Sequence, residues 1–169
     1  MSQVRTSFVR QMAKKILRES GITAPPVDLL QILRHNGIKY EEVDDFPDTV
    51  DALIIEDGTT VYAAVNARQH FHRQRFSLAH ELGHYFLHRD NTFGDPITID
   101  SPAEADDFGT KSPMETEADN FAGELLVPLE MLKLHVGKSI PELSKVFRVS
   151  EQAMGVAVSK NMNALYKAK

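Results

Sequence analysis

The sequence predicts an α+β domain in which a small antiparallel three-stranded sheet packs with several helices. Three strand-like runs lie close together within residues 38–66, and helical periodicities flank them on both sides. No internal repeat or linker divides the 169 residues. A chain of this length is one typical domain with a core of its own. We therefore expect a single domain over residues 1–169.

The composition narrows the class of protein. Apolar residues make up 42% and charged residues 25% of the chain, as in soluble globular proteins. No apolar run approaches the roughly 18 residues that cross a membrane, and the N-terminus lacks the apolar centre of a secretory signal, so we expect a cytoplasmic protein. Cysteine is absent, so any metal site must use nitrogen and oxygen ligands, which excludes a zinc finger. The net charge of -5 argues against nucleic acid as the main partner.

Residues 2–36 predict two N-terminal helices. Gly21 ends the first helix, Pro25 and Pro26 open the second, and Gly37 caps its end. The basic residues of the first helix favour a solvated helix face over a nucleic-acid arm. Its apolar residues recur at four-residue intervals: Val4, Phe8, Met12 and Ile16.

The predicted sheet occupies residues 38–66. Its runs, IKYEEV (38–43), DALIIED (51–57) and TVYAAVN (60–66), are rich in β-branched and aromatic residues. Asp57-Gly58 predicts a hairpin turn between the second and third strands.

Residues 67–89 predict a long helix that contains the sequence HELGH at 80–84. Asn66 and Gln69 have the spacing of a capping box at its start. The next segment, residues 90–112, is rich in Asp, Pro and Gly and predicts an acidic loop. Apolar residues follow helical spacing along the long helix: Phe71, Leu78, Leu82, Tyr85 and Phe86.

The C-terminal part predicts a helix over residues 113–127 and further helices over residues 128–169. Ser139 and Ser150 are expected N-caps, and residues 139–161 have a helix-turn-helix outline. Packing on the body of the domain is favoured over DNA binding, because the second helix offers few polar contacts: Gln152, Ser159, Lys160 and Asn161.

HELGH is typical of a catalytic metal site. Residues four apart on a helix lie one turn, about 5.4 Å, along the axis, so His80 and His84 can both reach one ion. Glu81 lies beside the ion's open side and can take a proton from a water there. The alternative is an ordinary helix on which two histidines fall one turn apart by chance.

A third ligand decides between these readings, because catalytic zinc uses three protein ligands. His88 lies about 12 Å along a straight helix from His80. Metzincin-type sites bring a third histidine back with a glycine, and residues 85–87 contain none. We therefore expect His88 to be structural, and His35, His70, His72 and His135 have no spacing argument for ligation.

A carboxylate from another helix is the better third ligand. Glu115 and Asp119 stand four apart on one face of the helix over residues 113–127. Glu115 can bind the ion while Asp119 accepts the other N–H of a ligand histidine. Glu117 is rotated about 200° from Glu115 and is the alternative ligand. A surface position is the alternative for each of these carboxylates.

The stretches RFSLAHELGHYFLH (75–88) and ETEADNFAGELLVP (115–128) resemble the ImmA/IrrE-type metallopeptidase family. The resemblance implies a thermolysin-like, minimal metallopeptidase (zincin) fold. It also implies a zinc ion held by His80, His84 and Glu115, with Glu81 as general base. Asp119 stands where the family often has Asn or Asp. ELSKVFRVSEQAM resembles the family's C-terminal part, but GVAVSKN lacks the Arg-Leu pair expected there, which leaves the role of the last helix open.

The resemblance also implies a function. Family members often act on a helix-turn-helix repressor encoded beside them, and some form toxin–antitoxin-like pairs. We therefore expect a zinc endopeptidase that cleaves such a repressor or antitoxin-like partner in a phage, mobile-element or stress circuit. The alternative is a regulatory component that binds the partner without cutting it. No feature of the sequence indicates an oligomeric state.

The sequence also suggests where a substrate would bind. If residues 60–66 form the sheet edge beside the zinc, a substrate could add to them as a strand. The small side chains of Ala63 and Ala64 would allow close approach, and Tyr62 would stabilise the oxyanion.

Overall fold

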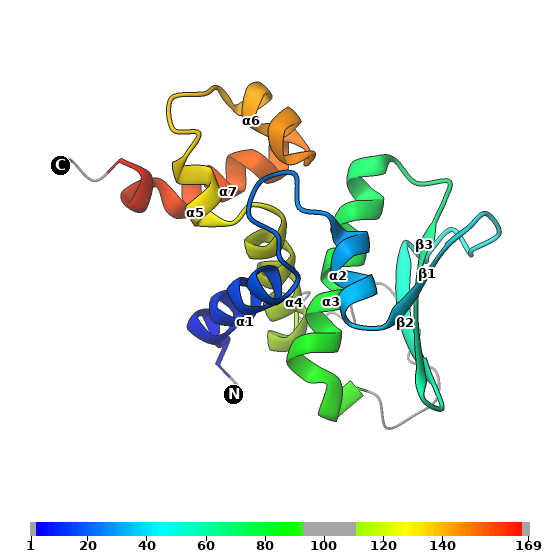
Figure 1. Cartoon of the computed structure of the whole chain (residues 1–169). Coiled ribbons are helices and arrows are strands. Elements are labelled where there is room, and N and C mark those ends of the chain that lie inside the picture. Colours follow the sequence, from blue (N-terminus) through cyan, green and yellow to red (C-terminus); the bar gives the residue numbers. More distant parts are fainter. Residues whose placement is uncertain (1–2, 93–110, 167–169) are drawn as a thin grey trace.

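The computed structural model describes residues 3–92 and 111–166 (Figure 1). This part of the chain has an α+β fold, so the predicted fold class is confirmed at that level. The predicted acidic loop falls almost entirely outside the described residues. The helices are α1 (Thr6–Glu19), α2 (Leu29–His35), α3 (Phe71–Thr92), α4 (Pro113–Leu126), α5 (Leu129–Lys133), α6 (Ile140–Phe147) and α7 (Glu151–Leu165).

The sheet contains β1 (Ile38–Val43), β2 (Ala52–Asp57) and β3 (Thr60–Asn66) in the order β1-β3-β2. The β2–β3 pair is an antiparallel hairpin, and Gly58 has a φ of 60° at its turn, as Asp57-Gly58 predicted. However, β1 pairs with β3 in parallel. The prediction of a wholly antiparallel sheet is therefore wrong, and the sheet is mixed.

The mixed sheet follows from the place of β3 between the other two strands. Residues 44–51 carry the chain across two strand spacings, about 10 Å, so β2 is not beside β1 and β3 returns into the space between them. The inward residues of β3 suit a central strand, because Val61, Ala63 and Val65 are all buried. Both edges of β3 are paired, so the prediction that residues 60–66 form a sheet edge is wrong.

The helix that carries HELGH starts later than predicted, at Phe71. The buried Asn66 side chain donates to the carbonyl of Val50 at 3.0 Å and accepts from the backbone N–H of Arg68. It therefore closes the end of β3, and the predicted capping box does not form. The first intrahelical bonds run instead to the carbonyl of His70, which accepts the N–H of Gln74 at 3.0 Å.

The centre of the molecule is the pair of helices α3 and α4 (Figure 1). The sheet packs on one side of α3, and α1 packs on α4. Gly83 allows the close approach of the pair, because a Cβ at this position would lie 2.9 Å from the Cα of Ala118. Leu82, Phe121 and Leu125 are fully buried around this contact.

The C-terminal helices form a group beside α4 (Figure 1). Ser139 forms a capping box with Glu142, and Ser150 accepts the N–H of Ala153, so both predicted N-caps are confirmed. Arg75 of α3 ties this group to the body by donating to the carbonyl of Arg148 at 3.1 Å, in the turn between α6 and α7. Among the described helices, none combines the length and apolar character that a membrane crossing needs.

Candidate metal centre

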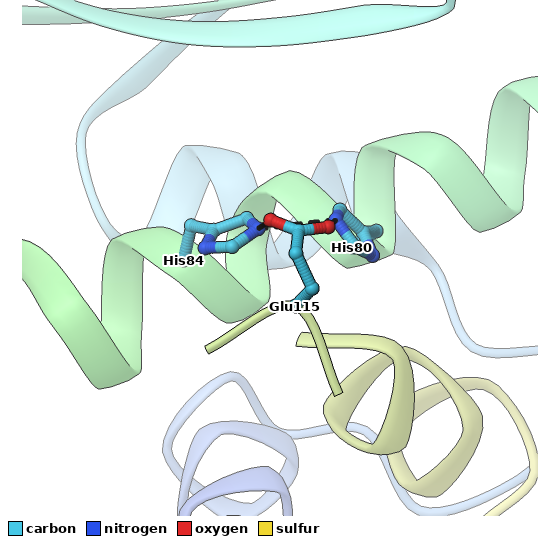
Figure 2. A group of neighbouring side chains, drawn as sticks. All are labelled: His80, His84 and Glu115. Atoms are coloured by element: carbon cyan, nitrogen blue, oxygen red, sulfur yellow. Dashed lines mark hydrogen bonds and ion pairs between the residues drawn. The ribbon is translucent and has the colours of Figure 1, made fainter. Parts of the chain in front are cut away.

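Two histidines of α3 and one glutamate of α4 converge (Figure 2). The Nε2 atoms of His80 and His84 lie 3.1 Å apart. Glu115 Oε2 lies 3.3 Å from the Nε2 of His80, and Oε1 lies 3.0 Å from the Nε2 of His84. The three side chains each offer a ligand atom within 4.8 Å of the other two.

Local sequence explains why Glu115 faces the histidines. Ser112 caps α4 by accepting the N–H of Glu115 at 3.2 Å, and Pro113 occupies the first turn. This start places Glu115 in the first turn of α4. The close contact of Gly83 with Ala118 then brings that turn within reach of α3.

Asp119 orients the first histidine. Its Oδ1 lies 2.9 Å from the Nδ1 of His80, while its Oδ2 accepts from the ammonium of Lys111 at 2.6 Å. With its Nδ1 paired to Asp119, the imidazole presents Nε2 to Glu115 and His84. Such a carboxylate partner fixes the tautomer and ring orientation of metal-binding histidines.

The charges of the centre are strongly coupled. Burial lowers the pKa of His80, but its hydrogen bonds with Asp119 and Glu115 outweigh burial and raise this pKa to about 10. Hydrogen bonds with His80 and His84 hold the pKa of Glu115 well below its usual range. The carboxylates are therefore ionised across the physiological range and concentrate negative charge around the two imidazoles.

This donor set fits a catalytic zinc ion. Two imidazole nitrogens and one carboxylate oxygen are ligands that zinc accepts, and three protein ligands leave a fourth position open. The Asp119 partner supplies the outer hydrogen bond that such ligands usually have. Among the described residues, no other group of three acidic or histidine side chains converges in this way.

A cavity of about 840 Å³ opens beside the centre. Glu81 lines it together with His80, Glu115 and Asp119, so the predicted base shares one space with two of the three predicted ligands. Other parts of its wall are formed by Ala52 at the start of β2 and, around the start of α7, by Val149, Ser150, Gln152 and Ala153.

His88 and Glu117 lie apart from the converging ligand atoms. The Nε2 of His88 lies 2.9 Å from Oε2 of Glu117, and both side chains are almost fully buried. The guanidinium of Arg5 also binds Glu117, with an Nη2–Oε2 distance of 2.6 Å. Sequence reasoning missed Arg5, because 112 residues separate it from its partner and no local spacing signals the contact.

The polar residues of the helix-turn-helix outline are partly turned inwards. Lys160 donates to the side chain of Asn120 on α4 at 2.8 Å. Asn161 is buried and donates to the carbonyl of Ala157. Gln152 lines the cavity beside the metal centre. Lys160 thus contacts α4 and Asn161 is buried, while Gln152 and Ser159 are exposed.

Comparison with known proteins adds three findings. The IrrE N-terminal-like domain matches residues 44–159. Metallopeptidase ImmA of Bacillus subtilis (strain 168) is 35% identical over 83 residues, a match that spans 48% of this chain and 44% of ImmA. A Mycobacterium tuberculosis transcriptional regulator superposes with a TM-score of 0.63 and 19% identity, over 90% of this chain and 46% of that chain, which shows a shared fold. The chain therefore spans less than half the length of each of these two proteins.

Proposed function

The chain belongs to the ImmA/IrrE-type metallopeptidase family, and from this premise we propose that it is a zinc-dependent endopeptidase. His80, His84 and Glu115 would hold the zinc, and Glu81 would be the general base. The observation that carries the proposal is the convergence of three ligand atoms beside a cavity that Glu81 also lines.

Each side chain has a defined task in this proposal. When bound, zinc lowers the pKa of a water and polarises the scissile carbonyl. Glu81 takes the proton from the attacking water and delivers it to the leaving amide nitrogen. Asp119 holds the imidazole of His80 in the tautomer that presents Nε2. The active-site arrangement would then be that of a thermolysin-like zincin.

The sheet offers a strand for substrate binding. Because β3 is central, β2 replaces it as the strand to which a substrate would add. Ala52, the first residue of β2, lines the cavity beside the metal centre. An extended peptide on β2 would therefore pass the centre, and its carbonyl would come within reach of Glu81.

We propose that the substrate is a transcriptional regulator, such as a helix-turn-helix repressor or antitoxin-like protein encoded nearby. The relative named Metallopeptidase ImmA supports the peptidase activity. The fold neighbour named as a transcriptional regulator is consistent with a role in such a circuit. DNA binding by the chain itself is not part of the proposal, because Lys160 bonds to Asn120 of α4 and Asn161 is buried.

Glu81→Gln tests the mechanism. The helix-turn-helix protein encoded next to this chain would be incubated with wild-type protein and zinc, and its fragments followed by mass spectrometry. Glu81→Gln should keep one zinc per chain but lower the cleavage rate by about 10²–10⁴-fold, the usual contribution of a general base. Glu124→Gln, a glutamate of α4 that pairs with Arg10, is the control that should cleave normally.

Two outcomes would contradict the proposal. Full cleavage by Glu81→Gln would exclude Glu81 as the base. A stoichiometric complex with the partner, with no fragments from wild-type protein, would favour regulation by binding alone.

A further inference from the structure

A second histidine–carboxylate cluster lies on the same two helices as the metal centre. Its carboxylate is Glu117 of α4, whose side chain is only 4% exposed. Oε2 contacts His88 Nε2 at 2.9 Å and Arg5 Nη2 at 2.6 Å. Oε1 accepts from the backbone N–H of Arg5 at 2.7 Å and from its Nε at 3.0 Å. One carboxylate therefore joins α3, α4 and the residue that precedes α1.

The cluster is one turn or less from the ligands on each helix. Glu117 follows Glu115 by two residues, about 3 Å of helix rise. His88 follows His84 by one turn, and the two rings have centroids 5.5 Å apart. A shift of Glu117 would therefore move the same turn of α4 that carries Glu115.

Arg5 supplies the cation of this cluster. Burial lowers the pKa of His88, so the imidazole is a neutral donor. A buried carboxylate needs a cationic partner, and the guanidinium provides one in a two-pronged geometry that a lysine cannot reproduce. Without the guanidinium, Glu117 would keep only its contacts with His88 and the backbone N–H of Arg5, and the half-exposed position of the lost side chain would admit water, towards which the carboxylate could shift.

We propose that Arg5 is a positioning residue of the metal centre, which holds Glu115 opposite His80 and His84 by fixing Glu117. This inference rests on the proposed function, since it assigns a support to the zinc site. Metal ligands must be placed within a few tenths of an ångström for tight binding. The start of α1 is therefore part of the support of Glu115, more than one hundred residues further along the chain.

The chain offers a matched control. Arg10 of α1 pairs with Glu124 of α4 at 2.7 Å, so this ion pair joins the same two helices. It lies two turns of α4 beyond Glu117, away from Glu115. Arg5→Ala and Arg10→Ala each remove one ion pair between α1 and α4, but only the first ion pair adjoins the ligands.

The experiment measures zinc affinity by competition with a chromophoric chelator in wild-type protein, Arg5→Ala and Arg10→Ala. We expect Arg5→Ala to weaken zinc binding about tenfold or more, the lower end of the effect of outer partners of metal ligands. Arg10→Ala should stay within about twofold of wild type, because its ion pair lies two turns of α4 away from the ligands. Visible absorption of the cobalt-substituted proteins should change for Arg5→Ala alone, because the spectrum reports the ligand geometry. Circular dichroism of the metal-free proteins shows whether each variant is folded.

Equal zinc affinities and identical cobalt spectra for the two variants would overturn the inference, because Arg5 would then only stabilise the fold. If Arg5→Ala does not fold, Arg5→Lys and Arg10→Lys replace the pair under the same criterion, since each keeps the charge and loses the two-pronged contact. Wild-type protein that binds neither ion would overturn the proposed function itself and this inference with it.

Discussion

Two clusters of histidine and glutamate on α3 and α4 differ in what lies at their centre. In the first, the Oε atoms of Glu115 face the Nε2 atoms of His80 and His84. In the second, the carboxylate of Glu117 faces His88 and the guanidinium of Arg5. In both clusters the histidines come from α3 and the glutamate from α4, but the described contacts include an arginine only in the second.

The source of the cation distinguishes a metal site from a structural ion pair in this molecule. The second cluster contains a cation from the protein itself, so its carboxylate is already neutralised. In the first cluster, the described ion pairs of Glu115 are with two imidazoles, and a metal ion that displaced the proton of His80 would supply the cation. The origin of the cation separates the two roles of glutamate better than the spacing does.

Glu115→Gln is the change with the largest expected effect on metal binding. Loss of a ligand carboxylate should weaken zinc binding by more than about 100-fold, because even outer partners of ligands contribute 10–100-fold. The metal-free protein should lose only about 1 kcal/mol of unfolding free energy, because Gln can still accept hydrogen bonds from the two imidazoles at this cavity wall. Chelator competition and thermal unfolding measure the two effects. Unchanged zinc affinity would remove Glu115 from the ligand set.

Glu117→Gln should lower the stability of the protein more, and its zinc affinity less, than Glu115→Gln. The substitution leaves Arg5 without its carboxylate, so we expect the metal-free protein to lose about 2 kcal/mol of unfolding free energy, below the 3–5 kcal/mol of a fully buried pair because Arg5 is half-exposed. Zinc affinity should fall less than in Glu115→Gln. Urea unfolding of the metal-free variants measures the first effect. A variant that loses zinc as completely as Glu115→Gln would make Glu117 a ligand after all and break the distinction between the clusters.

The local part of the site could be predicted from the sequence, because it depends on helical spacing. His80 and His84 are one turn apart on a single helix, and Glu115 and Asp119 are one turn apart on another. These spacings predicted which side chains share a face, and the structure brings those faces together. The roles of His80, His84 and Glu115 as metal ligands, and of Asp119 as the residue that orients His80, stay predictions.

The rest depends on contacts between distant segments. The Asp57-Gly58 pair predicts the hairpin turn, but no local sequence pattern indicates that β3 lies between β1 and β2. Neighbouring strands in a sequence pair often enough to make the antiparallel order the default prediction. The start of α3 was misplaced for a similar reason, because the Asn66 side chain bonds to Val50, which is sixteen residues away.

Gly83→Ala tests the close contact on which both clusters depend. Alanine is favoured over glycine in a helix by about 1 kcal/mol, but the new Cβ would lie 2.9 Å from the backbone of Ala118. We expect the helices to separate at a net cost of about 1–2 kcal/mol, with weaker zinc binding, as overpacking of a core predicts. The control is Gly123→Ala on α4. A Cβ at this position would meet nothing within 4 Å, so the substitution should stabilise the protein slightly. Equal effects of the two substitutions on zinc affinity would show that the helix spacing does not control the centre.

Lys111→Ala has the smallest expected effect and separates the two partners of Asp119. Lys111 is 54% exposed, and such an ion pair contributes about 0–1 kcal/mol, so zinc affinity should change by less than about threefold. Asp119→Asn also removes the acceptor for the Nδ1–H of His80 and should weaken zinc binding about 10–100-fold. Chelator competition on both variants compares them directly. If Lys111→Ala weakens binding as much as Asp119→Asn, the ammonium holds Asp119 in place, and the support of His80 extends to residue 111.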